Sequence, residues 1–335
     1  MRPTTLAFLL VVGCGGGVSD GSNASTPPVP PSPPPTSTAT PPAPGLTLDA
    51  ALAQGRSLAV DDAHVFLASE QRSLARFPAL LDATGAPLLA GYFGYVALDA
   101  TSVYTVRDSR TIVRLPKGGG PEIVLTTLDT GAASGGVRVA GDNVYFLSVT
   151  TTGGLEHQVS HCALERVPAA GGAPTVLMTY DGCGDFVVDD HAVYALRDAE
   201  LLVIPVDGSA SSVLTTFAGA DASYLSLAQD DTRLWAAALH GSHVFSVAKA
   251  GGAVAPRATT SGLPHSITVA GEDLYWLEIP TDLGGPAAAD VMTATKSGGP
   301  PRRLLAGVVG AEAIAVNTDA VYSAGLGALH RVLRH

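Results

Sequence analysis

Lysine and charge are scarce in this chain. Among its 335 residues there are only three lysines, Lys117, Lys249 and Lys296, and charged residues of all kinds make up 15%. The formal net charge is -11. Nucleic-acid binding usually requires clustered lysine and arginine, so this composition argues against a partner bound through its phosphates. The chain nevertheless has 46% hydrophobic residues, enough for a large core, which excludes a wholly disordered protein.

Signatures of catalysis are also missing. The sequence contains no H-E-x-x-H motif, no Walker loop and no dinucleotide fingerprint, so it predicts no catalytic residue. A structural zinc site needs close pairs such as C-x2-C, and none is present. His157, His161, Cys162 and Cys183 therefore predict no metal site, and no cofactor is expected.

The N-terminus is typical of an exported protein. Arg2 precedes an apolar run, Leu6–Val12, that is too short to span a bilayer and predicts the core of a signal peptide. The run ends in Val11-Val12-Gly13-Cys14, which resembles the bacterial lipobox. The resemblance implies that Cys14 receives a diacylglycerol and becomes the mature N-terminus. An ordinary signal peptide with a chance cysteine is the alternative.

A tract rich in Gly, Ser, Thr and Pro follows at residues 15–45. It cannot bury enough apolar surface to fold, so the sequence predicts a disordered tether between a signal peptide over residues 1–14 and a domain over residues 46–335. Gly15 stands where an inner-membrane retention signal would have Asp. The lipoprotein resemblance therefore implies a lipid anchor in the outer membrane or at the cell surface, and we expect a monomer.

A short phrase recurs seven times in the rest of the chain, for example as LAVDDAHVFL from Leu58 and VVDDHAVYAL from Val187. Each copy has alternating apolar positions, a polar turn and a strand rich in β-branched and aromatic residues, which predicts a β-hairpin. The aromatic positions are separated by 38, 41, 49, 41, 40 and 47 residues; they are Phe66, Tyr104, Tyr145, Tyr194, Trp235, Tyr275 and Tyr322.

A second phrase follows each of the first six hairpins, as in TIVRLPKGGGPEIVL from Thr111. This phrase predicts a strand, a turn of small residues and another strand. Four strands in about forty residues are typical of a β-propeller blade. The seventh copy lacks its fourth strand, which Leu46–Ala53 could provide, closing the ring and hiding both edges. The sequence thus predicts an all-β fold, a seven-bladed β-propeller of four-stranded blades closed by an N-terminal strand.

The phrases A-V-D-x-x-x-V-Y and R-V-P-x-x-G-G-x-P resemble the repeats of bacterial extracytoplasmic propellers of the TolB-like and NHL-like kind. The resemblance covers nearly the whole chain after residue 45. It implies the fold but no single function, because propellers include binding proteins, hydrolases, lyases and dehydrogenases.

Pairs of aspartates recur at 61–62, 189–190 and 230–231. Each pair falls between the first two strands of its blade, where the Asp side chain bonds nearby backbone amides. Recurrence at one position in several blades favours turn formation over catalysis.

Two cysteines remain once Cys14 is assigned to a lipid. Cys162 is expected to begin the third strand of blade three, and Cys183 to lie in the loop that leaves the fourth strand. Both positions belong to the same face of the propeller, so a disulfide is plausible and would be permitted outside the cytoplasm. Two independent buried thiols are the alternative.

Two blades carry expanded connections, Ser148–His161 in blade three and Glu278–Asp290 in blade six. Long loops on a rigid scaffold often carry function, and polar residues that start the inner strands converge at the central channel. The candidate binding face therefore comprises Tyr95, Glu156, His157, His161, Asp185, Tyr224, His265, Glu278, Asp282 and Glu312.

These features favour a surface-tethered binding or scaffolding propeller that recognises a protein, peptide or glycan. The alternative is an ion-dependent hydrolase or a lyase, whose acids and histidines would converge on a divalent ion at the channel. A channel lined by polar residues and filled with water is the simpler interpretation.

Overall fold

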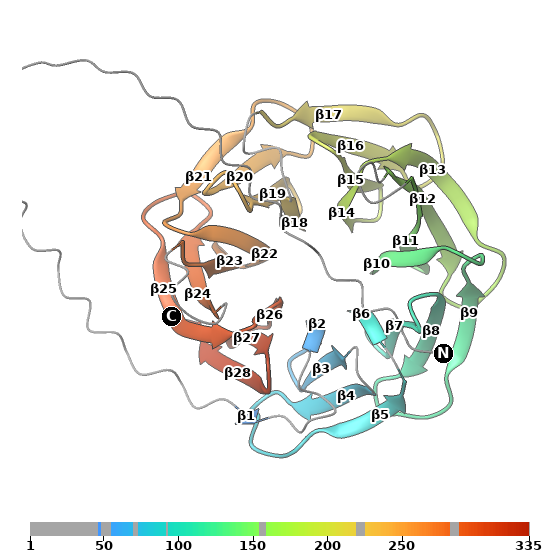
Figure 1. Cartoon of the computed structure of the whole chain (residues 1–335), viewed down its shortest axis with the longest axis horizontal. Coiled ribbons are helices and arrows are strands. Elements are labelled where there is room, and N and C mark those ends of the chain that lie inside the picture. Colours follow the sequence, from blue (N-terminus) through green and yellow to red (C-terminus); the bar gives the residue numbers. More distant parts are fainter. Residues whose placement is uncertain are drawn as a thin grey trace, which may run out of the picture. The chain divides into compact units, whose positions relative to one another are not determined.

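The computed structural model describes residues 46–47, 55–69, 73–91, 93–153, 159–218, 225–281 and 288–334. Their strands form seven four-stranded antiparallel sheets, which surround a common axis like blades (Figure 1). The predicted seven-bladed β-propeller is confirmed. Among the described residues, no helix is long and apolar enough to cross a lipid bilayer.

The blades follow one another along the chain. Blades one to three are β2 (Gly55–Val60), β3 (His64–Ser69), β4 (Ser73–Pro78) and β5 (Ala86–Ala90); β6 (Phe93–Leu98), β7 (Ser102–Arg107), β8 (Thr111–Pro116) and β9 (Ile123–Thr127); and β10 (Ala133–Ala140), β11 (Asn143–Thr152), β12 (Val159–Pro168) and β13 (Thr175–Asp181). Blades four to six are β14 (Cys183–Val188), β15 (Ala192–Arg197), β16 (Glu200–Pro205) and β17 (Ser212–Thr216); β18 (Leu225–Gln229), β19 (Arg233–Ala238), β20 (His243–Ala248) and β21 (Ala255–Thr259); and β22 (Leu263–Ala270), β23 (Asp273–Ile279), β24 (Ala288–Thr295) and β25 (Arg302–Val309).

Blade seven closes the ring. It contains β26 (Ala313–Val316), β27 (Ala320–Gly325), β28 (Ala328–Leu333) and, as its outermost strand, β1 (Leu46–Thr47). Leu46 pairs with Leu329, and Thr47 pairs with Ala328. The predicted N-terminal closing strand is therefore confirmed over its first two residues, while residues 48–54 lie outside the described part.

The described residues form seven apolar core clusters, one at each boundary between neighbouring blades. The recurrent aromatic residue sits in the second strand of every blade, where at most 5% of its surface is exposed. The first strand of each blade lies nearest the axis and the fourth lies outermost (Figure 1). Burial of the repeated aromatic positions thus explains the period seen in the sequence.

Aspartate shapes the turn between the first two strands of several blades. Oδ1 of Asp61 accepts hydrogen bonds from the backbone N–H groups of Ala63 (2.9 Å) and His64 (2.8 Å). Asp189 and Asp230 accept the equivalent bonds in blades four and five. The predicted turn-forming role of these acids is confirmed.

All three lysines join neighbouring blades. Each follows the third strand of its own blade and reaches the turn aspartate of the preceding blade. The Nζ to Oδ2 distances are 2.8 Å for Lys117 and Asp61, 2.7 Å for Lys249 and Asp189, and 2.8 Å for Lys296 and Asp230. Burial alone would raise the pKa of each carboxyl, but hydrogen bonds from the lysine and from the turn amides outweigh it and lower the pKa.

Candidate functional site

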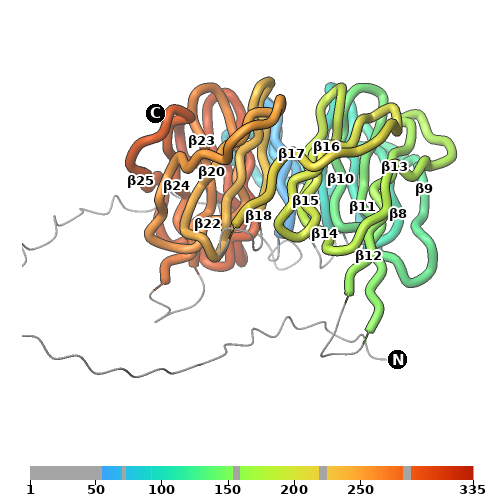
Figure 2. Tube along the Cα trace, turned by 90° about the horizontal axis from the view of Figure 1, so that it is seen from above, coloured from blue at the N-terminus to red at the C-terminus, as the bar shows by residue number. Residues whose placement is uncertain are grey.

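The second and third strands of blade three form the longest hairpin of the propeller. β11 and β12 have ten residues each, and their shared end projects beyond the neighbouring blades (Figure 2). The sequence predicted a loop over Ser148–His161. Instead, most of this segment is paired strand, with Thr150 opposite His161 and Thr152 opposite Val159. The segment forms strands and not a loop because its Thr and Val residues favour extended backbone.

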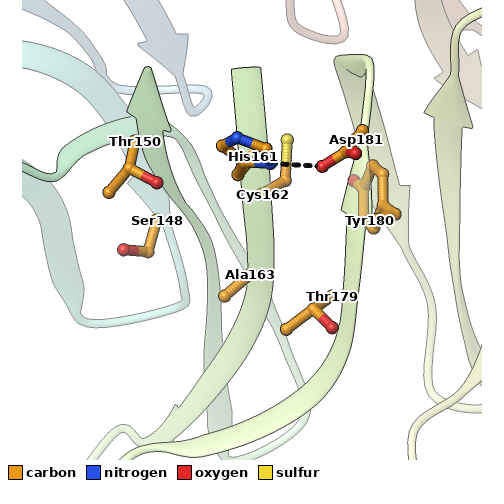
Figure 3. Close-up of a pocket in the computed structure, with 8 residues that line it drawn as sticks. All are labelled: Ser148, Thr150, His161, Cys162, Ala163, Thr179, Tyr180 and Asp181. Carbon is orange, nitrogen blue, oxygen red and sulfur yellow. Dashed lines mark hydrogen bonds and ion pairs between the residues drawn. The ribbon is translucent and has the colours of Figure 1, made fainter. Parts of the chain in front are cut away.

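A pocket of about 500 Å³ lies on one face of this hairpin. It is lined by Ser148, Thr150, His161, Cys162, Ala163, Thr179, Tyr180 and Asp181 (Figure 3). Side chains alternate along a strand, and Cys162 and Tyr180 belong to the cluster shared with blade four. The side chains of Ser148, Thr150, His161 and Asp181 therefore point the other way, toward blade two. We call this hollow the blade-three pocket.

His161 connects three strands at the open end of the blade-three pocket. Its Nδ1 lies 2.5 Å from Oδ1 of Asp181 on β13, and its Nε2 lies 2.7 Å from Oγ1 of Thr152 on β11. A carboxylate can only accept a hydrogen bond, so Nδ1 is the donor. When the imidazole is neutral, Nε2 accepts the hydroxyl proton of Thr152. The side chains of His161 and Asp181 are 42% and 65% exposed.

A disulfide braces the same region. Cys162 is bonded to Cys183, with their Cα atoms 5.8 Å apart, and the predicted pairing is confirmed. The sequence placed Cys162 at the start of a strand and Cys183 in a loop. Instead, Cys162 lies inside β12, and Cys183 is the first residue of β14. The bond consequently links blade three to blade four.

A second hollow, which we call the channel mouth, lies where the innermost strands of blades one, two and three begin, on the same end of the propeller. Its volume is about 280 Å³, and its lining includes Arg56, Tyr95, Ser134 and Glu312. Arg56 Nη1 lies 2.7 Å from Glu312 Oε2, which joins blade one to blade seven. Ser134 pairs across the sheet with Ser148 of the blade-three pocket, so the two hollows adjoin.

Asp185, on the innermost strand of blade four, is held from two sides. Its Oδ1 lies 2.9 Å from Arg138 Nη2 of blade three, and its Oδ2 accepts the backbone N–H of Leu227 of blade five at 2.9 Å. The carboxylate therefore links three consecutive blades.

His265 and Glu278, both in blade six, are largely enclosed. Nδ1 of His265 lies 3.1 Å from the hydroxyl of Ser266, and burial lowers the pKa of the imidazole to about 4. Glu278 is only 4% exposed. Its carboxylate accepts hydrogen bonds from Ser261, Gly262 and the indole of Trp276, so it braces the connection between blades five and six.

Three of the described candidate binding residues line the two hollows, whereas Asp185, His265 and Glu278 line neither. The structure places Tyr95 and Glu312 together at the channel mouth, whereas His161 belongs to the blade-three pocket. Cys14, Glu156, His157, Tyr224 and Asp282 lie outside the described residues. Within the described ranges, no group of three or more His, Cys, Asp or Glu side chains is arranged to hold a metal ion.

Sequence reasoning missed several partners of these residues. Thr152 and Asp181 meet His161 only because of the strand register, and Arg56 and Arg138 meet their acids across blade boundaries. Period-two alternation on β11, β12 and β13 could have placed Thr152, His161 and Asp181 on one face. It could not have fixed which residues stand opposite each other.

No protein-family model matches the sequence, and no curated protein matches it. Solved structures do resemble it. Virginiamycin B lyase from Staphylococcus aureus is 14% identical, with a TM-score of 0.66 over 87% of this chain and 99% of that one. BamB from Moraxella catarrhalis is 13% identical, with a TM-score of 0.54 over 88% and 97%. YCF48 bound to D1 peptide is 12% identical, with a TM-score of 0.62 over 87% and 97%. At these identities the likeness shows the fold alone, which is shared by a lyase and by a protein that binds a peptide.

Proposed function

We propose that this chain is a binding or scaffolding propeller of the bacterial cell envelope, tethered by a lipid on Cys14 and by residues 15–45. It recognises a polar segment of a protein, peptide or glycan through the blade-three pocket and the adjoining channel mouth. The lipobox-like residues support the anchor. The disulfide supports an oxidising compartment, because such bonds are rare in the cytoplasm.

The blade-three pocket is the observation that carries this proposal. Its volume of about 500 Å³ lies in the range of small-molecule sites. Hydroxyls, an imidazole and a carboxylate line it, and together they can both donate and accept hydrogen bonds. Such a lining suits a ligand rich in hydroxyl or amide groups, and Ser134 and Ser148 provide a polar path to the channel mouth.

The distribution of charge near the axis supports binding over ion-dependent catalysis. An enzyme of that kind needs acids and histidines directed at one spot. Here Glu312 pairs with Arg56, and Asp185 pairs with Arg138 and with a backbone amide of the next blade. These carboxylates are engaged in holding blades together.

A binding survey of the full chain against arrays of defined glycans and peptides tests the proposal. The affinity of the best ligand is then compared between variants. Thr179→Arg places a long side chain in the blade-three pocket and should weaken binding at least tenfold, about 1.4 kcal/mol. Thr175→Arg is the matched control, because Thr175 is also exposed on β13 but does not line the pocket.

The two variants separate the outcomes. Weak binding by Thr179→Arg with wild-type binding by Thr175→Arg supports the pocket as the ligand site. Equal binding by wild type and Thr179→Arg removes the pocket from the proposal. If no member of the arrays binds the wild-type chain, the binding function itself is refuted.

A further inference from the structure

Three side chains at the open end of the blade-three pocket form a continuous hydrogen-bonded series, which we call the blade-three relay. The hydroxyl of Thr152 faces Nε2 of His161 at 2.7 Å, and Nδ1 of His161 faces Asp181 at 2.5 Å. Hydroxyl, imidazole and carboxylate stand in the order used by nucleophilic hydrolases, in which a base activates the hydroxyl and an acid orients the base. Binding a ligand does not require this order.

We propose that Thr152 is an acyl-accepting nucleophile and that the blade-three relay transfers an acyl group from a small ester to water. His161 is the general base, and Asp181 is the positioning residue that holds the Nδ1–H tautomer. This activity goes beyond ligand binding and does not depend on the glycan or peptide ligand proposed above.

The step balances without any further reagent. Oγ1 of Thr152 attacks the ester carbonyl carbon while its proton passes to Nε2 of His161. The carbon–oxygen bond to the leaving alcohol then breaks, and that alkoxide takes the proton from Nε2. Water then attacks the acyl carbon while its proton passes to Nε2 of His161. The bond from that carbon to Oγ1 breaks, Oγ1 takes the proton from Nε2, and the acid is released.

The surroundings of the blade-three relay suit this chemistry. Thr152 and Asp181 are exposed, so substrate and water can reach them. Thr150, two residues from Thr152 on the same face of β11, has a hydroxyl that lines the blade-three pocket and is available as a donor to an oxyanion (Figure 3). Such donors stabilise the charge that develops on the carbonyl oxygen.

The disulfide holds the relay in place. Cys162 directly follows His161, and Cys183 is two residues beyond Asp181. The cross-link therefore fixes the backbone beside both the imidazole and the carboxylate. A base held by a rigid neighbour loses less entropy when the reacting geometry forms.

Hydrolysis of p-nitrophenyl acetate by the full chain tests the proposal, with intact-mass and peptide analysis to locate an acetyl group. Wild type should show a burst and an acetyl group on Thr152. Thr152→Ala should lose both, and Thr152→Ser should retain them. His161→Gln should slow acylation by about 10²-fold or more, because general-base catalysis typically contributes at least that factor. Asp181→Asn should slow acylation as well, since it no longer fixes the Nδ1–H tautomer.

Thr151→Ala is the matched control. Thr151 is the neighbouring exposed threonine on β11, and alternation points its side chain to the opposite face, so its removal should leave the burst unchanged. Acetyl groups found only on other residues, or a Thr152→Ala rate equal to wild type, would refute the relay. These outcomes are independent of the array experiment, because Thr179→Arg and the ligand arrays report on binding alone.

Discussion

Removal of the Cys162–Cys183 disulfide should lower the free energy of unfolding by about 3 kcal/mol. The two residues are 21 positions apart, and in the chain-entropy model closing a loop of about twenty residues restricts the unfolded chain by that amount at 25 °C. Guanidinium unfolding of the wild-type chain with and without reductant measures the difference. Reduction keeps both sulfur atoms in place, so it isolates the cross-link from the packing of Cys162, which is 3% exposed.

The double variant Cys162→Ala, Cys183→Ala adds the packing contribution and should be less stable than reduced wild type, because it removes a buried sulfur from the core between blades three and four. Trp235 and Trp276 lie in blades five and six, so their fluorescence reports whether the distant blades unfold together with blade three. A loss below about 1 kcal/mol on reduction would contradict the reasoning, since it would mean that the unfolded chain is not freed by opening the loop.

Two further predictions concern the lysines and the lipid anchor. Lys249→Met should lower the free energy of unfolding by about 1 to 2 kcal/mol, because it leaves the partly buried Asp189 carboxylate without its cation; Lys249→Arg should restore part of the loss in the same chemical unfolding assay. The pKa of Asp189 is lowered below its usual 3.8 in the folded chain, so this contribution is present above pH 4 and fades as the pH falls through the folded pKa. A Lys249→Met variant as stable as wild type at pH 7 would contradict this account. In a bacterial host, Cys14→Ser should abolish labelling of the protein by a fatty-acid analogue; unchanged labelling would place the lipid elsewhere, and a wild-type chain without label would refute the anchor.

The fold was predictable because every blade repeats the same local sequence pattern. One buried aromatic residue, a polar turn and alternating apolar positions recur at nearly constant spacing, and each of these patterns is local in sequence. The missing fourth strand of the last copy predicted the closure that Leu46 and Leu329 make. The disulfide was predicted from the cysteine count and from the expectation that both cysteines lie on the same face of the propeller, although the position expected for each within its blade was wrong.

The contacts of the site were less predictable because they depend on register and on blade boundaries. Asp181 and Thr152 reach His161 only after three strands are aligned to the residue. Glu278 looked like the start of a loop, yet strand β23 continues to Ile279 and encloses the carboxylate. Asp185 meets Arg138 and Leu227 from two other blades, and no local pattern encodes such a meeting.

The lysine–aspartate contacts also favour the observed order of the blades. Seven sheets of similar shape could associate in the wrong sequence, or with a blade of another molecule, since each presents a similar apolar face. Lys117, Lys249 and Lys296 each match an aspartate on the preceding blade, whereas the residues at the equivalent position in blades one, three and four, Ala79, Ala169 and Val206, carry no charge. A blade inserted out of order would bury a lysine or an aspartate without its counter-charge, which is costly. At three of the seven boundaries, the lysines thus favour a preceding blade that carries a turn aspartate over one that does not.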